Sequence, residues 1–135
     1  MEELHKLIII LILFIVLLIY DINTKYKTCI KNNFFKIFPI IFLHRLINVF
    51  MYTGWIFNNK KILYIYLFFI FLLIIHWITN KNKCILTDLE NKICEFPDDT
   101  QYDFISKKFG KNVLLYYFFV CCISVGIVIY KLLRK

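Results

Sequence analysis

The sequence predicts an all-α protein that crosses a membrane as a four-helix bundle, with short amphipathic surface helices between the third and fourth crossings. Of the 135 residues, 61% are hydrophobic, whereas a soluble domain has about 45–50%. The apolar residues are concentrated in four runs of roughly bilayer-spanning length. Basic residues lie directly beside these runs, where they meet lipid headgroups: Lys60, Lys61, Lys131, Arg134 and Lys135.

The first predicted membrane helix covers residues 4–20. Between residues 7 and 20 the only polar group is the hydroxyl of Tyr20. At about 1.5 Å per residue, this run is just long enough to cross a thin bilayer. A cleaved signal peptide is the alternative, but Glu2 and Glu3 precede the run and no small-x-small cleavage site follows it. We therefore expect a retained membrane anchor.

The second and third predicted helices cover residues 37–57 and 62–79. Pro39 falls in the first turn of the second helix, where a missing N–H costs little. This helix also carries His44, Arg45 and Asn48, so it is the least lipid-like of the four. The third run is apolar until His76. The turn at 58–61 predicts that the two helices form an antiparallel hairpin.

The fourth predicted helix covers residues 113–130. Its small residues allow close helix packing within a bilayer: Cys121, Cys122, Ser124 and Gly126. Four crossings place both chain ends and the turn at 58–61 on one membrane face, called side A. The segments 21–36 and 80–112 then lie on the opposite face, side B. The short basic flanks of side A favour a cytosolic location for that side.

The surface segment 80–112 contains a capping-box pattern, Thr87-Asp88-Leu89-Glu90, which predicts a helix start at Thr87. Apolar residues then recur at helical spacing until Pro97. A second amphipathic helix is predicted from Asp98 or Asp99 to a stop at Gly110. Residues 1–135 are expected to form a single membrane domain.

The polar residues of the second and third helices are the strongest candidates for a site, because titratable groups inside a membrane are costly. His44 and His76 lie at nearly equal sequence distances from the turn at 58–61. Equal rise per residue therefore places both near side B, where the surface helix begins. The sequence predicts that six residues converge there: His44, Arg45, His76, Cys84, Thr87 and Glu90.

Two interpretations of this cluster remain open. In the first, it is structural: Arg45 pairs with Glu90 or Asp88, and the histidines bond backbone carbonyls. In the second, it binds a lipid headgroup, a small ligand, a metal or a haem. No C-x-x-C or H-x-x-x-H spacing is present. We therefore predict no metal site, no cofactor and no catalytic residues.

The five cysteines also allow two interpretations. Cys84 and Cys94 can form a disulfide if side B faces an oxidising compartment. The alternative is that all the thiols are free. Cys121 and Cys122 are adjacent within the fourth helix, where packing is their expected role.

Several functions are excluded by missing patterns, including a glycine-rich phosphate loop and a nucleophile elbow. Nucleic-acid binding is not expected despite the net charge of +8, because basic residues such as Lys60 and Lys131 lie beside apolar runs and no basic face interleaves with a soluble fold. The leading prediction is a non-enzymatic integral membrane protein with a structural or interaction role. Its predicted partners are the lipid bilayer and other membrane proteins or a second copy. The alternative is a ligand-binding membrane protein that uses His44, His76 and Cys84.

A distinctive set of residues runs through the second half of the chain: His76-Trp77, Cys84-Ile85-Leu86-Thr87-Asp88-Leu89-Glu90-Asn91, Tyr102, Phe104 and Ile105. In these residues the segment from about His44 to the C-terminus resembles a family of small uncharacterised membrane proteins. Bacterial members carry Cys-Pro-Leu-Thr-x-x-Glu-Asn after a histidine-bearing helix, with an earlier histidine in the preceding helix, and similar patterns occur in predicted membrane proteins of large DNA viruses. The chain departs from the pattern at Ile85, where the family has proline, and at the added Cys94. The resemblance implies the four-helix architecture and no particular activity.

Overall fold

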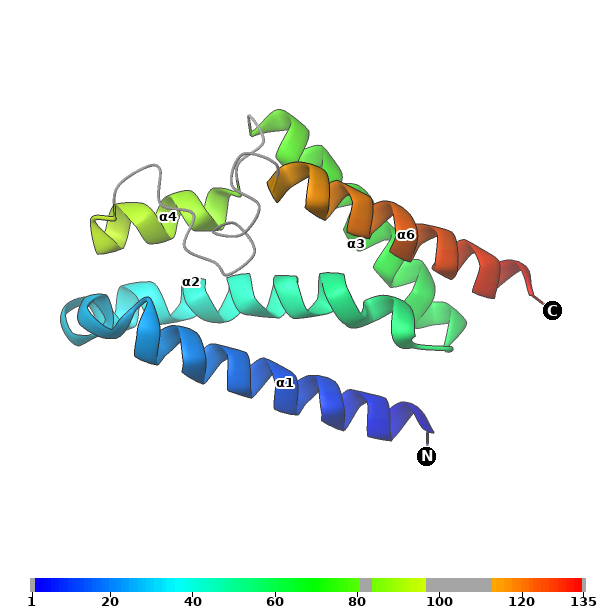
Figure 1. Ribbon diagram of the computed structural model, residues 1–135, viewed down its shortest axis with the longest axis horizontal. Helices are drawn as coiled ribbons and strands as arrows, with labels where there is room; N and C mark the ends of the chain where they lie inside the picture. Colours follow the sequence, from blue (N-terminus) through cyan, green and yellow to red (C-terminus); the bar gives the residue numbers. More distant parts are fainter. Residues whose placement is uncertain (1, 81–83, 97–112, 135) are drawn as a thin grey trace.

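A computed structural model describes residues 2–80, 84–96 and 113–134, and this part of the chain is helical without any strand. The second surface helix predicted at 98–110 lies outside the described residues. In chain order the elements are α1 (Glu2–Thr24), α2 (Lys27–Thr53), the short 3₁₀ helix η1 (Gly54–Ile56), α3 (Lys60–Thr79), α4 (Ile85–Cys94) and α6 (Val113–Leu133) (Figure 1).

Four of these helices are long and apolar enough to cross a membrane: Glu2–Thr24, Lys27–Ile56, Lys60–Thr79 and Leu115–Leu133. Large apolar side chains such as Ile9 on α1, Phe68 on α3 and Phe119 on α6 are each more than 60% exposed. A soluble helix would bury such a face, whereas lipid accepts it. The prediction of four membrane-length apolar helices is therefore confirmed, and the protein has the properties of a membrane protein.

The start of α2 differs from the prediction. The helix begins at Lys27 instead of residue 37 and bends at Asn33, whose backbone is not helical (φ −131°, ψ 29°). Pro39 consequently lies in the helix interior instead of the first turn. The reason is that Tyr26 and Cys29 are buried, so the chain packs against α1 directly after the connection and has no room for an extended loop.

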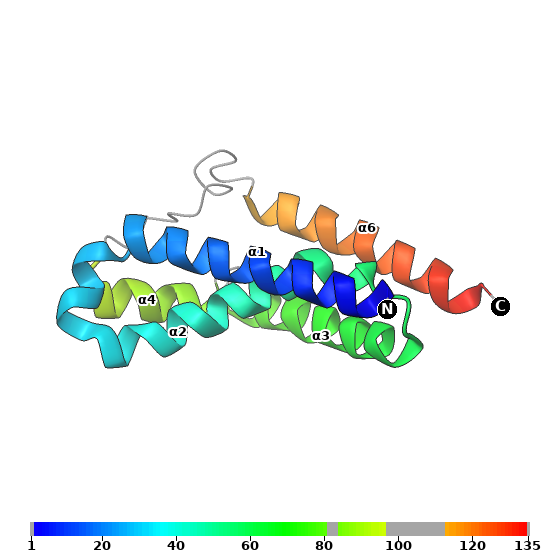
Figure 2. The ribbon, with the colours of Figure 1, turned by 90° about the horizontal axis from the view of Figure 1, so that it is seen from below.

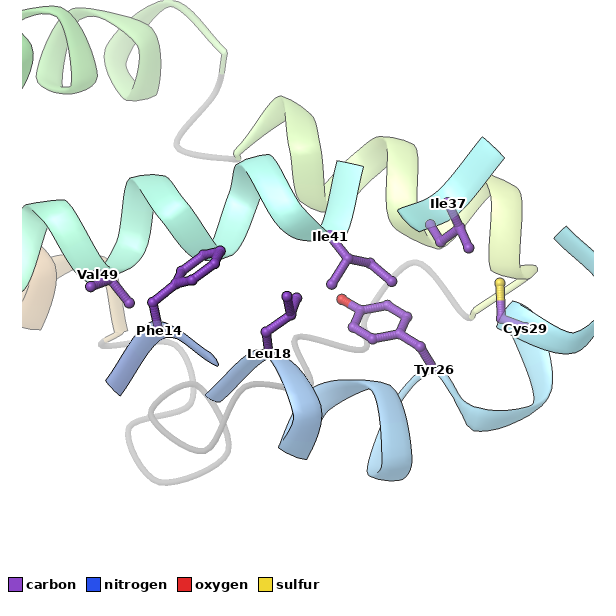
Figure 3. Close-up of a cluster of buried hydrophobic side chains, with 7 residues drawn as sticks. All are labelled: Phe14, Leu18, Tyr26, Cys29, Ile37, Ile41 and Val49. Carbon is purple, nitrogen blue, oxygen red and sulfur yellow. The ribbon is translucent and has the colours of Figure 1, made fainter. Parts of the chain in front are cut away.

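The first hydrophobic core lies between α1 and α2. Figure 3 shows its buried side chains pointing toward one another: Phe14, Leu18, Tyr26, Cys29, Ile37, Ile41 and Val49. Phe14 meets Phe42 edge to face, with ring centroids 5.1 Å apart. Ile93 and Phe96, from α4 and just beyond it, pack onto the same core. Both α1 and α4 are therefore held by α2.

The second core joins α3 and α6 to the end of α2. Its buried residues are Met51, Leu63, Tyr66, Ile70, Cys121 and Val128. The helices α2 and α3 meet at η1 and separate from there, while α3 and α6 lie side by side (Figures 1 and 2). The predicted hairpin of α2 and α3 is therefore an open one. Most of α2 belongs to the first core, whereas α3 and the end of α2 belong to the second.

Polar contacts at side A join the start of α1, the turn and the end of α6. The Lys131 ammonium donates to the carbonyls of Trp55, Ile56 and Phe57 at 2.9, 3.2 and 3.2 Å. The backbone N–H of Asn58 donates to Glu3 Oε1 at 3.0 Å. Both ends of the chain thus lie at one end of the bundle, as four crossings require (Figure 1).

The small residues of α6 face two directions. Cys121 and Ser124 are buried, but Cys122 and Gly126 are exposed. Close packing of α6 therefore uses only part of the predicted small-residue surface.

Gly54 and Gly126 provide a matched pair of substitutions. A Cβ atom at Gly54 would lie 2.6 Å from Cε2 of the fully buried Tyr66 ring, which must then move. We expect Gly54→Ala to lower the free energy of unfolding by about 1–3 kcal/mol. Gly126→Ala meets nothing within 4 Å, so it should be neutral or slightly stabilising. Unfolding of both variants in detergent checks this, and equal stabilities would contradict it.

Candidate functional site

The start of α4 differs from the predicted capping box. The helix begins at Ile85, two positions before Thr87, and Cys84 is its N-cap residue. The N–H of Ile85 donates to His76 Nε2 at 3.2 Å, and the N–H of Asp88 donates to the Cys84 carbonyl at 3.1 Å. The capping box does not form, because Glu90 points into the protein and bonds other residues.

Glu90 is the centre of the site and is only 1% exposed. Tyr26 donates its hydroxyl to Glu90 Oε2 at 2.5 Å, and the Lys25 ammonium donates to the same oxygen at 3.2 Å. His44 Nδ1 lies 2.7 Å from Glu90 Oε1. The carboxylate therefore connects α4 both to the α1–α2 connection and to the middle of α2.

These partners keep Glu90 ionised. Burial by itself raises the pKa of the Glu90 carboxyl, but the hydrogen bond and charge of His44, the charge of Lys25 and the Tyr26 hydroxyl together lower it below its ordinary value. A buried carboxylate is tolerable only when its oxygens are bonded in this way.

Arg45 does not pair with Glu90 or Asp88 as predicted. Its guanidinium donates to the Asp21 carboxylate on α1. Consecutive residues on a helix point about 100° apart, so Arg45 faces α1 while His44 faces α4. Of the six residues expected to cluster, Arg45 is therefore held in a separate ion pair with Asp21, whereas His44 and Glu90 pair with each other.

Cys84 is a free and partly exposed thiol beside His44. Burial raises the pKa of the Cys84 thiol, but the interaction with His44 and the backbone N–H groups of Thr87 and Leu86 lower it below the ordinary value overall. Thiolates are favoured at helix N-termini and beside histidine for the same reasons. Thr87 contributes to the site through its backbone.

The disulfide also differs from the prediction. Cys94 is bonded to Cys29 on α2, with the two Cα atoms 5.2 Å apart, and not to Cys84. The reason is that α4 holds Cys84 and Cys94 at opposite ends, about 15 Å apart at ordinary helical rise. A disulfide requires Cα atoms within roughly 7 Å.

The structure thus brings together five residues that we call the α4 cluster: Lys25, Tyr26, His44, Cys84 and Glu90. His76 borders the cluster through the N–H of Ile85, and Arg45 lies in the separate pair with Asp21. Sequence reasoning missed Lys25, Tyr26 and Asp21, because it treated the segment 21–36 as a surface connection. The polar residues that follow the first apolar run were the available signal.

Within residues 2–80, 84–96 and 113–134, no group of three or more His, Cys, Asp or Glu side chains is arranged to hold a metal ion. The α4 cluster contains three groups near the start of α4: the bonded Glu90 carboxylate, the His44 imidazole and the Cys84 thiol. Comparison of the chain with protein-family models, curated proteins and solved structures finds no match.

Proposed function

We propose that the protein is a multi-pass membrane protein with a structural or interaction role, in which the membrane helices hold α4 in a fixed position. The observation that supports this role is the bonding of Glu90. Its carboxylate is bonded by Lys25, Tyr26 and His44, which come from α2 and the connection before it. These polar groups bond one another across the bundle, so they stabilise the attachment of α4.

The opposite face of α4 is the surface that this attachment presents. Ile85 and Leu89 are 52% and 39% exposed, and Asp88 and Lys92 are exposed beside them. Apolar and charged residues at four-residue spacing make an amphipathic face. Such a face suits the membrane surface or another membrane protein, including a second copy.

We also infer kinship with the small uncharacterised membrane proteins that carry the Cys-x-Leu-Thr-x-x-Glu pattern. The support is that the pattern residue Glu90 bonds His44, the earlier histidine on α2. This contact gives the spacing of the pattern a physical reason.

Full-length protein purified in detergent tests the structural role. We expect elemental analysis and the absorbance spectrum to show no stoichiometric metal or haem, and His44→Ala to lower the unfolding temperature. A metal ion or haem present once per chain in the wild type, and lost in His44→Ala, would overturn the proposal in favour of a ligand-binding site.

A further inference from the structure

We propose that Asn48, on the inner face of α2, is the centre of a binding site for an uncharged lipid that carries a hydroxyl group. The hydroxyl bonds the side-chain amide of Asn48, and the lipid chain lies against the apolar residues beside it. The site lies between the two hydrophobic cores and is separate from the α4 cluster.

The inner face of α2 is covered by different helices toward its two ends. Glu90 of α4 contacts His44, and α4 extends from there toward the start of α2 (Figure 1). The α3–α6 pair covers the other end of this face, where Met51 belongs to the second core. Asn48 lies between these two covered parts, one turn after His44 and three residues before Met51.

The exposure of Asn48 differs from that of its neighbours on the same face. Ile41 and Met51 are each 1% exposed, and Asn48 lies within roughly 60° of both around the helix axis. Asn48 is nevertheless partly exposed. The lipid-facing side of α2 carries Leu43 and Leu46 instead. The side chain of Asn48 therefore meets an accessible space between the cores, and not the surrounding bilayer.

The Asn48 amide has bonding capacity that the protein does not use. Within residues 2–80, 84–96 and 113–134, no other group forms a hydrogen bond with this side chain. The amide offers two N–H donors and one carbonyl acceptor. Asn48 belongs to the membrane-length segment Lys27–Ile56, where lipid tails cannot bond a polar group and such a group is costly. A molecule that bonds the amide therefore gains free energy.

The charges near Asn48 indicate that this molecule is uncharged. His44 is paired with Glu90, and Arg45 is paired with Asp21. An ionic ligand would have to break one of these pairs, which leaves a charge without compensation. A hydroxyl group supplies one donor and one acceptor without any charge, so it matches both sides of the Asn48 amide.

The surroundings of the amide suit a slender apolar chain. Ile41 and Met51 border it on α2, and Tyr52, one turn after Asn48, has its ring 6.4 Å from that of Tyr117 on α6. Ligand sites are typically apolar with a few polar groups that fix orientation. Helices α1 and α6 both contact α2, so a further helix, about 10 Å wide, does not reach Asn48. A lipid chain is narrower.

The first test labels the full chain in phosphatidylcholine vesicles with two photoreactive probes. One is hexadecanol that carries a diazirine, and the other is the same chain without the hydroxyl group. Mass spectrometry locates the adducts. We expect the alcohol to label the segment around Asn48 roughly three- to tenfold more than the hydrocarbon, as one to two hydrogen bonds would give. Equal labelling by the two probes, which is expected if only water bonds the amide, would overturn the proposal.

The second test compares Asn48→Leu with the control Asn23→Leu. Asn23 is exposed at the end of α1 and bonds the Ile19 carbonyl, so its replacement should leave the preference for the alcohol unchanged. Asn48→Leu should remove that preference. Without a probe, its unfolding temperature should equal or exceed that of the wild type, because no internal hydrogen bond is lost. A preserved preference contradicts the proposal, and so does a lowered unfolding temperature, which would show that Asn48 is a structural residue.

Discussion

Replacing Glu90 with glutamine is expected to lower the free energy of unfolding by about 3 kcal/mol. Glutamine keeps the size of the side chain but removes the charge that Lys25 and His44 require. Breaking a buried ion pair by removing one partner costs about 3–5 kcal/mol, because the other charge remains without compensation. The lower end of this range applies, since the Lys25 and His44 side chains are 14% and 18% exposed.

Unfolding of the full chain in detergent measures this loss, and Glu95→Gln is the matched control. Glu95 directly follows α4 and is exposed, so its charge contributes little. Equal stabilities of the two variants would show that Glu90 is not the residue that holds α4.

The effect of Glu90→Gln should also depend on pH. The pKa of Glu90 is lower in the folded protein than its ordinary value of 4.5. A carboxyl with a lowered pKa stabilises the fold fully above its unfolded pKa, and this contribution is lost as the pH falls through the folded value. The stability difference between wild type and variant should therefore be greatest above pH 4.5 and shrink in more acidic solution. A difference that grows on acidification would contradict the assignment.

Removing the Cys29–Cys94 disulfide is expected to have the second large effect. The two cysteines are 65 positions apart, and a cross-link that closes a loop of this size stabilises the folded chain by about 4 kcal/mol in the chain-entropy treatment. We expect Cys29→Ser to lose a stability of this order, and reduction of the wild type to reproduce the loss. Unfolding measured with and without reductant provides the comparison.

Cys84→Ser is the control for the disulfide, because Cys84 is a free thiol. Reduction should destabilise Cys84→Ser as much as it destabilises the wild type, because the variant keeps the Cys29–Cys94 bond. Peptide mapping under non-reducing conditions identifies the bonded pair directly. A linked Cys84–Cys94 peptide would contradict the pairing in the structure.

Hydrophobic periodicity predicted the long helices because burial in lipid depends on composition over many residues. The same information did not predict the start of α2. Lys27, Lys31 and Asn33 are polar residues and indicate a surface connection, yet Tyr26 and Cys29 attach this segment to the first core. Cys29 is also bonded to Cys94, which is distant in sequence. In this segment, tertiary contacts decide the structure, although the local sequence pattern indicates a loop.

The same distinction applies to the site. Counting residues from the turn placed His44 near the surface helix, and its contact with Glu90 follows from that depth. The partner of Arg45 could not be obtained in this way, because depth does not say which neighbour a side chain faces. Asp21 on α1 is that neighbour. The capping box failed for a related reason: the Glu90 carboxylate finds three bonds inside the protein, whereas a cap would have supplied one.

The ammonium group of Lys131 has a consequence for the order in which the protein assembles. It bonds three consecutive carbonyls, those of Trp55, Ile56 and Phe57, at the turn between α2 and α3. In a chain made from its N-terminus, α1, α2 and α3 are synthesised before Lys131. Until α6 is in place, these three carbonyls need other hydrogen-bond donors. The last residues of α6 therefore complete the bonding of this turn, so the turn reaches its final structure only after the C-terminal helix has been made.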